Sequence, residues 1–131
     1  VVLGPQDDRF AAQGIETFLG GVYRVGAASD RMGCRLEGPP IAHVRPGAAD
    51  ILSDGVPLGA VQVPAGGQPI VMLVDRQTTG GYAKIATVVS VDIPLLAQCV
   101  PGQGRVRFEA VSVAQAQASY REMMRSLNGA W

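Results

Sequence analysis

The chain has few of the residues that bind metals and no excess of charge of either sign. Its 131 residues include two cysteines and a single histidine, His43, and the cysteines, Cys34 and Cys99, lie far apart in the sequence. A structural zinc site takes about four ligands, so we expect no metal centre and interpret both cysteines as small buried side chains. The formal net charge is zero, which leaves no electrostatic footprint for a nucleic-acid backbone.

Long apolar runs and familiar catalytic motifs are also missing. No segment approaches the roughly 20 apolar residues of a membrane-spanning helix, and we expect no membrane partner. Neither a P-loop, a GxSxG elbow nor an HExxH zinc motif is present. The low cysteine content is typical of a cytoplasmic protein, so we predict that location.

The residues that are present predict one globular domain covering residues 1–131. The hydrophobic fraction is 47% and the charged fraction 17%, as in folded proteins of this size. Because the chain opens on Val1 without an initiator methionine, we interpret it as part of a longer protein.

Glycine and proline divide the chain into many short segments with turns between them, which predicts a mainly β (α+β) fold. We expect a small closed β-barrel with flanking helices. The predicted strands span residues 22–25, 34–37, 59–63, 69–74, 85–91 and 106–113. The predicted helices span residues 7–19, 93–98 and 113–127. We expect a turn at residues 53–55 and a packing face on the last helix, where Trp131 docks or meets a partner.

Two short segments hold most of the polar residues that could carry chemistry. The first, residues 29–39, has four charged side chains within eight positions, among them Asp30 and Arg31. It is either a solvated edge strand, where charge opposes aggregation, or one wall of a site. The second, residues 75–84, lies between two apolar strands and is predicted to be a rigidly held loop.

This second segment suits an anionic or amide ligand. Arg76 offers a planar fork of donors for a carboxylate or phosphate. Gln77, Thr78 and Thr79 add neutral donors and acceptors, and glycines let backbone N–H groups approach a ligand. Its polar residues and glycines are Asp75, Arg76, Gln77, Thr78, Thr79, Gly80, Gly81 and Lys84.

Two isolated polar residues are further candidates. Lys84 is the only lysine among 11 basic residues, which suggests a role that arginine could not fill, although a surface lysine is the simpler interpretation. Gln62 interrupts an apolar strand, so its side chain faces either solvent or a polar pocket.

Taken together, these segments resemble one family. The resemblance rests on SDRMG with RLEGP (residues 29–33 and 35–39), ILSDG (51–55), GAVQVP (59–64), GQP (67–69) and DRQTTGGY (75–82). The family is the biotin-dependent carboxyltransferases, also called allophanate hydrolase subunit 2 or KipA. Its bacterial members are interpreted as the C subunit of 5-oxoprolinase (PxpC), and the match covers about the C-terminal half of a typical family member.

The resemblance implies a cyclophilin-like barrel and an ATP-dependent opening of 5-oxoproline to glutamate. It also implies two partners, a KipI-like B subunit and a LamB/YcsF-type A subunit, and a small amide substrate. On this basis we expect Arg76, Lys84 and Asp75 to act in catalysis. We expect the following residues to bind substrate or complete the wall of the site: Gln77, Thr78, Thr79, Gly80, Gly81, Gln62, Arg31 and Asp30.

Two other functions remain open at this point. A carboxyltransferase could use the same polar loop to hold the ureido group of biotin and an acceptor amide. A KipA-like regulatory module would bind KipI without chemistry. A peptidyl-prolyl isomerase is disfavoured, because a shared fold does not carry function.

Overall fold

The structure is a computed structural model that describes residues 1–129, so Trp131 lies outside the described residues. The strands are β1 (Val2–Leu3), β2 (Tyr23–Val25), β3 (Gly33–Glu37), β4 (Asp50–Gly55), β5 (Ala60–Gln62), β6 (Ile70–Met72), β7 (Thr79–Tyr82), β8 (Lys84–Thr87) and β9 (Arg105–Val106). The helices are α1 (Ala12–Gly20), α2 (Ile93–Ala97) and α3 (Val113–Gly129), with short 3-10 turns η1 (Asp7–Arg9) and η2 (Ser90–Asp92).

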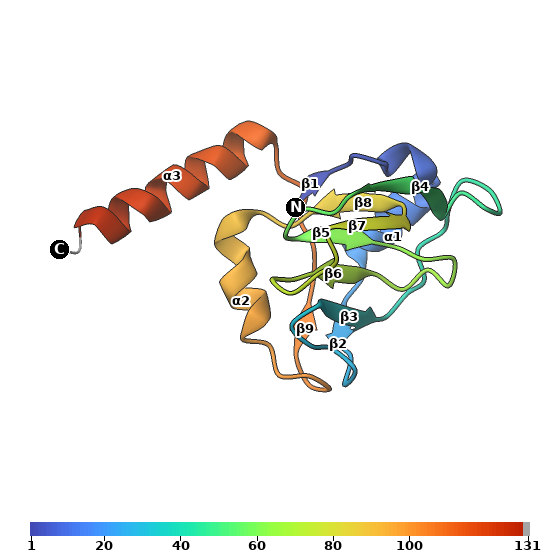
Figure 1. Cartoon of the computed structure of the whole chain (residues 1–131), viewed down its shortest axis with the longest axis horizontal. Helices are drawn as coiled ribbons and strands as arrows, with labels where there is room; N and C mark the ends of the chain where they lie inside the picture. Colours follow the sequence, from blue (N-terminus) through green and yellow to red (C-terminus); the bar gives the residue numbers. More distant parts are fainter. Residues whose placement is uncertain (130–131) are drawn as a thin grey trace.

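Seven strands form one curled sheet in the order β1-β8-β5-β6-β3-β2-β9. The chain after β9 brings the two ends of this sheet together, because the Val1 nitrogen donates to Glu109 O and Val111 N donates to Val1 O, both at 2.8 Å. These two bonds have the pattern of a parallel strand pair. The expected mainly β barrel with flanking helices is confirmed (Figure 1).

The two faces of the sheet differ, since side chains alternate between faces along each strand. Val61, Val71 and Cys34 are register partners across β5, β6 and β3, and each is at most 3% exposed in the main core. Phe18 of α1 stacks on Phe108 at 4.5 Å between ring centroids. Full burial of one such side chain stabilises the fold by about 1.5–3 kcal/mol.

A separate ribbon covers the other face. β4 and β7 pair only with each other, and Val56, which follows β4, packs with Ala60 and Met72 in a second, smaller apolar cluster. The turn predicted at residues 53–55 is wrong, because these residues end β4. The loop predicted over residues 75–84 is wrong in its second half, because β7 and the start of β8 occupy residues 79–82 and 84.

The first helix starts later than predicted. Asp7–Arg9 form the turn η1, and Phe10 makes a β-bridge with His43. Ala11 is extended, so α1 begins at Ala12 without a side-chain cap. The pairing of Phe10 with a segment distant in the sequence breaks the helix that the apolar spacing predicts.

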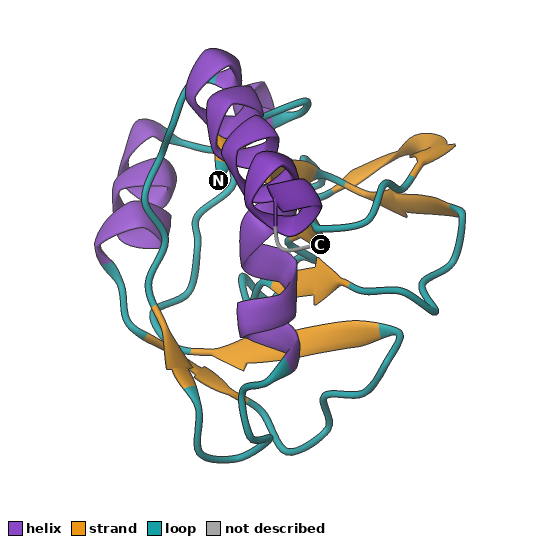
Figure 2. Cartoon of the chain, turned by 90° about the vertical axis from the view of Figure 1, so that its left-hand side faces the viewer, coloured by secondary structure: helices purple, strands orange, loops and turns teal. Residues whose placement is uncertain are grey.

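The last two helices confirm the prediction from sequence, whereas the strand predicted over residues 106–113 is reduced to the two residues of β9. α2 covers the barrel beside β9, and α3 projects away from it (Figure 1). Figure 2, which views the chain from the side, shows α3 in front of the strands. No residue of α3 between 113 and 129 is buried, and no helix within residues 1–129 has the length and apolarity to span a membrane.

Candidate functional site

The outer face of the sheet carries a row of side chains from four neighbouring strands. The Cα register pairs Lys84 with Gln62, Gln62 with Ile70, and Ile70 with Arg35. Directly opposed residues project from the same face of a sheet. The register shifts between Val61 and Gln62, and Lys84 is placed on this face by its Nζ, which lies 3.7 Å from Asp54 Oδ2 of β4. The row therefore places one lysine, one amide and one guanidinium on the face that the β4–β7 ribbon covers.

Part of this row opens into a cavity of about 320 Å³, the polar cavity, between the sheet, the ribbon and the loop before β3. Strands β3, β5 and β6 form its floor, while residues of the ribbon and of the β2–β3 loop form its walls. The polar cavity is lined by Asp30, Met32, Gly33, Arg35, Gln62, Pro64, Ile70, Met72, Gln77 and Tyr82. Three of the residues predicted from sequence meet here: Asp30, Gln62 and Gln77.

Gln62 is the most buried polar side chain of the polar cavity, at 6% exposure. Its amide makes no hydrogen bond to another described residue, although its side chain lines the cavity. Gly80 of β7 leaves room for this amide, because a Cβ there would lie 2.8 Å from Gln62 Nε2 and 3.2 Å from Val56 Cγ2. Gly81 has no such role, since its Cβ would meet only Ile51 O, at 3.4 Å.

Asp30 contributes to the cavity wall mainly by shaping the loop. Its Oδ1 accepts hydrogen bonds from Met32 N at 2.8 Å and Gly33 N at 3.2 Å. These bonds turn the chain into β3 and fix where Arg35 enters the sheet. Asp30 also borders a second cavity, of about 390 Å³, together with Arg31, Cys34 and Cys99.

Arg31 and Asp75 lie together outside the polar cavity. Arg31 Nε donates to Asp75 Oδ2 at 2.7 Å, and the two side chains are 77% and 51% exposed. The hydrogen bond from Arg31 holds the pKa of the Asp75 carboxyl below its ordinary value. Asp75 N also donates to Arg31 O at 3.0 Å, so this pair fastens the β2–β3 loop to the turn after β6.

Arg76 is engaged by the backbone. Its Nε donates to Val56 O at 2.8 Å, and a second nitrogen lies 3.5 Å from Leu73 O. Val56 N in turn donates to Thr78 O at 3.0 Å. Arg76 and Thr78 thus hold the ribbon in place, while Thr79 pairs with Gly55 at the end of β4 and is exposed.

Lys84 is buried, at 1% exposure, and is therefore no surface lysine. Its Nζ lies 3.7 Å from Asp54 Oδ2 and makes no hydrogen bond to another described residue. Gln6 bridges the same two residues, since Gln6 Nε2 lies 3.4 Å from Asp54 Oδ2 and Lys84 N donates to Gln6 Oε1. The hydrogen bond from Gly55 N, followed by the charge of Lys84, lowers the pKa of Asp54.

The site also contains two residues that the sequence analysis did not single out, Arg35 and Tyr82. Both lie within segments that it recognised as polar. The signal for Arg35 was its alternation with the buried residues Cys34 and Leu36 in β3, which places it on the face opposite the core. Arg76, Lys84 and Asp75, predicted to be catalytic together, bind different partners, and none of the three lines the polar cavity.

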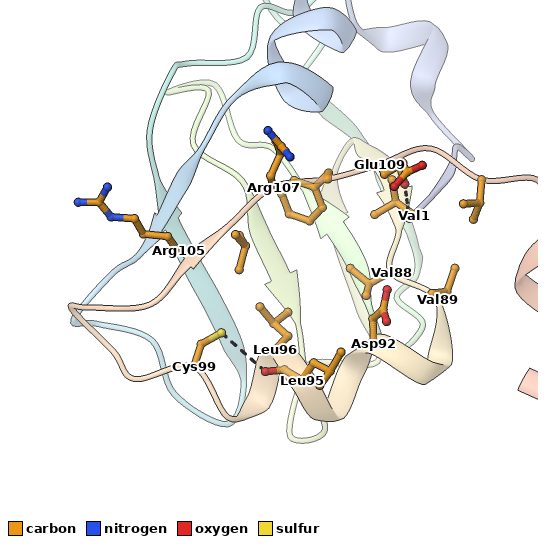
Figure 3. A pocket seen from close by; sticks show the side chains of 13 residues that line it. Val1, Val88, Val89, Asp92, Leu95, Leu96, Cys99, Arg105, Arg107 and Glu109 are labelled. Atoms are coloured by element: carbon orange, nitrogen blue, oxygen red, sulfur yellow. Dashed lines mark hydrogen bonds between the residues drawn. The ribbon is translucent and has the colours of Figure 1, made fainter. Parts of the chain in front are cut away.

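A further cavity, of about 460 Å³, lies between α2 and the segment 105–111 (Figure 3). Its wall is largely apolar, with Leu96, Val88 and Phe108 contributing, and charged groups stand at its edge. None of the residues predicted to bind substrate lines it. The polar cavity is therefore the better candidate site for an amide ligand.

Comparison with known proteins adds family information to this geometry. Residues 1–110 match the family described as "Carboxyltransferase domain, subdomain A and B". The C subunit of 5-oxoprolinase from Haemophilus influenzae is 47% identical over 88 residues, which is 67% of this chain and 28% of that protein. The C subunit of the Escherichia coli 5-oxoprolinase is 36% identical over 122 residues, 93% of this chain and 38% of that protein. The chain thus spans well under half the length of these relatives.

Two solved structures share the fold. The Kluyveromyces lactis urea amidolyase superposes with a TM-score of 0.91 over 98% of this chain and 8% of that one. Its 24% identity makes it evidence for the fold alone. The protein TTHA0988 is 38% identical with a TM-score of 0.69, covering 83% of this chain and 20% of that one.

Proposed function

The chain belongs to the family of carboxyltransferase domains, subdomains A and B, and from this premise we propose that it forms part of the C subunit of an ATP-dependent 5-oxoprolinase. That enzyme opens 5-oxoproline, a cyclic amide, to glutamate. The two relatives named as the C subunit of 5-oxoprolinase support the assignment. A protein named as a subunit works with others, and we propose a KipI-like B subunit and a LamB/YcsF-type A subunit as partners.

One observation locates the proposed amide-binding site. The side-chain amide of Gln62 lines the polar cavity and has no hydrogen-bond partner among the described residues. The amide atoms of Gln62 are reached from the cavity, because Lys84 Nζ is the one fully buried side-chain atom without a partner among the described residues. A ligand amide pairs well with Gln62, because each partner then both donates and accepts. Gln77 and Tyr82, which also line the cavity, supply further groups that can orient the ligand.

We propose that residues of this chain bind and orient the amide of the substrate and do not act as nucleophiles on it. Resonance makes an amide a poor electrophile, so ring opening needs activation. Donors fixed around the amide oxygen stabilise the charge that develops there. We propose that Gln62 and Gln77 bind the lactam. Arg76, Lys84 and Asp75 then act as positioning residues, because they hold the β4–β7 ribbon and the adjacent turn over the cavity.

The residues that the sequence predicted to bind anionic groups of ATP, Arg76, Gly80 and Gly81, do not line the polar cavity. Both glycines lie in β7, where Gly80 is the register partner of Asp54. The guanidinium of Arg76 is already engaged by backbone carbonyls. We therefore propose that the triphosphate binds elsewhere in the assembled enzyme.

The test is 5-oxoproline-dependent release of phosphate from ATP by the full-length protein assembled with both partners. Gln62→Leu, similar in volume, removes the amide, and we expect kcat/KM to fall at least about tenfold, since one lost hydrogen bond is worth about 1.4 kcal/mol. Gln103→Leu is the control, because Gln103 is exposed and does not line the cavity. Absence of release by the wild-type assembly would overturn the function, and an unimpaired Gln62→Leu enzyme would overturn the site.

The family description favours a second candidate, biotin-dependent carboxyl transfer to a urea-like nitrogen. The same amide-binding groups suit the ureido ring of biotin. The two functions separate in one assay: formation of a carboxylated product from carboxybiotin, without 5-oxoproline turnover, would favour transfer.

A further inference from the structure

Arg35 brings a positive charge to the polar cavity. It lies in β3, two strands from Gln62, and both side chains line the same space. Two strand spacings separate their backbones by roughly 10 Å. Long side chains that lean inward from such positions can hold the two ends of one small molecule.

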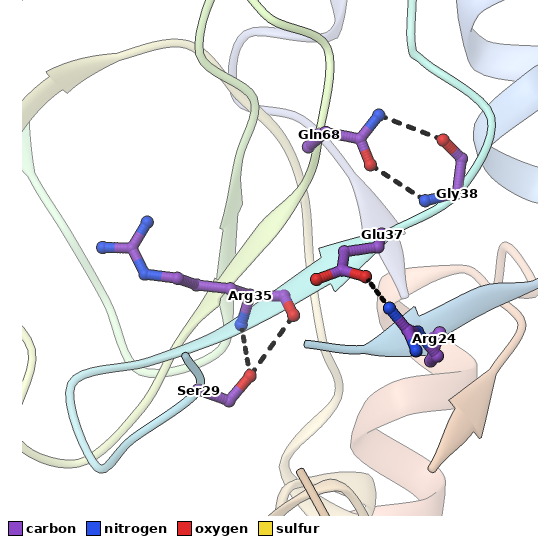
Figure 4. A network of polar contacts seen from close by, with 6 residues as sticks. All are labelled: Arg24, Ser29, Arg35, Glu37, Gly38 and Gln68. Atoms are coloured by element: carbon purple, nitrogen blue, oxygen red, sulfur yellow. Dashed lines mark hydrogen bonds and ion pairs between the residues drawn. The ribbon is translucent and has the colours of Figure 1, made fainter. Parts of the chain in front are cut away.

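The other arginines near β3 and the cavity are already paired. Arg24 forms an ion pair with Glu37, Arg31 with Asp75, and Arg76 donates to backbone carbonyls. Arg35 makes no ion pair or side-chain hydrogen bond within residues 1–129. Figure 4 shows its side chain extending away from the Arg24–Glu37 pair.

The backbone of Arg35 is held firmly although its guanidinium is free of partners within residues 1–129. Arg35 N donates to Ser29 Oγ at 2.9 Å, and Ser29 Oγ donates to Arg35 O at 3.2 Å (Figure 4). The carboxylate of Asp30, also in the cavity lining, is committed through Oδ1 to the turn before β3. The backbone of Arg35 is therefore held in place, while its guanidinium keeps five N–H donors available for a ligand.

We propose that Arg35 binds the carboxylate of the substrate while Gln62 binds its amide, so that the cavity selects small cyclic amides that carry a carboxylate. This inference rests on the proposed function and deepens it. A guanidinium binds a carboxylate through two parallel hydrogen bonds, which fixes orientation as well as affinity. A urea-like acceptor has no carboxylate, so Arg35 also distinguishes the two candidate functions.

The experiment compares 5-oxoproline with 2-pyrrolidinone, the same lactam without a carboxylate, in the assembled enzyme. Arg35→Met keeps the apolar stem, and we expect the KM for 5-oxoproline to rise about tenfold to a hundredfold, with a smaller change in kcat. The preference for 5-oxoproline over 2-pyrrolidinone should fall by the same factor. Arg35→Lys should restore part of it, and Arg107→Met, an exposed arginine outside this cavity, should leave it unchanged.

Unchanged selectivity in folded Arg35→Met would overturn the role of Arg35 while leaving the proposed function standing. If the wild-type assembly does not turn over 5-oxoproline, the proposed function fails. Binding of the carboxylate by Arg35 is then tested separately. The chain of residues 1–131 is titrated with 5-oxoproline while the NMR signal of the Arg35 side chain is followed. A saturable shift that Gln62→Leu weakens would support the carboxylate site, and no shift would overturn it.

Discussion

At the scale of single residues, the candidate site depends on space left for one amide. Gly80→Ala would place a methyl group 2.8 Å from Gln62 Nε2, in a position closed on its other side by Val56. The amide is the end of a flexible side chain, so it can move aside at a small cost in stability. We expect Gly80→Ala to displace the Gln62 side-chain amide signal in NMR spectra while lowering the free energy of unfolding in urea titrations by less than about 1 kcal/mol.

Gly81→Ala is the matched control, because its new Cβ would make only an ordinary contact. Both glycines lie in β7 and lose the same backbone freedom on substitution, so the difference between the variants isolates the contact with Gln62. A Gln62 amide signal that shifts no more in Gly80→Ala than in Gly81→Ala would contradict the close packing of Gly80 against the amide.

The pair of Asp54 and Lys84 predicts a pH-dependent stability. The pKa of Asp54 is lowered in the folded chain, first by the Gly55 N–H and then by Lys84. Its contribution is therefore fully present above its ordinary pKa of 3.8 and is lost as the pH falls through the lower, folded value. We expect Asp54→Asn to be less stable than wild type at neutral pH, because it leaves the buried Lys84 ammonium uncompensated, and the difference should shrink below about pH 4.

Lys84→Met provides the contrast. Replacing a buried charge by an apolar side chain of similar length removes the desolvation cost together with the ion pair, so we expect a change within about 1 kcal/mol. Thermal unfolding of both variants between pH 3 and pH 8 checks this. A pH dependence of Asp54→Asn identical to that of wild type would show that Asp54 does not stabilise the fold.

At the scale of elements, the sequence predicted those helices and strands that depend on a local pattern of apolar residues. The apolar residues around Val61 and Val71 mark core strands by alternation, and α3 is given by its helical spacing. β7 could not be predicted, because residues 79–82 are polar and glycine-rich. They become a strand only by pairing with β4, which lies well before them in the chain. The candidate site was predicted only in part, because it also depends on pairing between distant strands. Arg35 and Gln62 line the same cavity because both are register partners of Ile70 in β6.

The exposed helix α3 is expected to be the least protected element. No residue between 113 and 129 is buried, and an isolated helix of this length is marginal in water. Native-state hydrogen exchange should show amides of α3 exchanging at least about a hundredfold faster than those of β5 and β8, which lie in the middle of the sheet. Equal protection that fades on dilution would show instead that a second copy covers α3.

At the scale of the whole molecule, barrel closure depends on a seam between the first residues and the chain after β9. Val1 is 7% exposed, and it bonds to Glu109 and Val111 while β1 pairs with β8. Removing residues 1–3 opens this seam and exposes the edge of β8. Because the lost burial of Val1 alone is worth about 1.5–3 kcal/mol, we expect the deletion to cost more than that and to broaden the unfolding transition.

Deletion of residues 113–131 is the control for this seam, because it removes a longer segment that buries no residue between 113 and 129. We expect it to leave the midpoint of urea unfolding nearly unchanged. Circular dichroism and fluorescence, followed together, check whether each variant unfolds in a single transition. If deletion of residues 1–3 also left the midpoint unchanged, the barrel would not depend on the contacts of Val1, and the sheet would be stable as an open, curled layer.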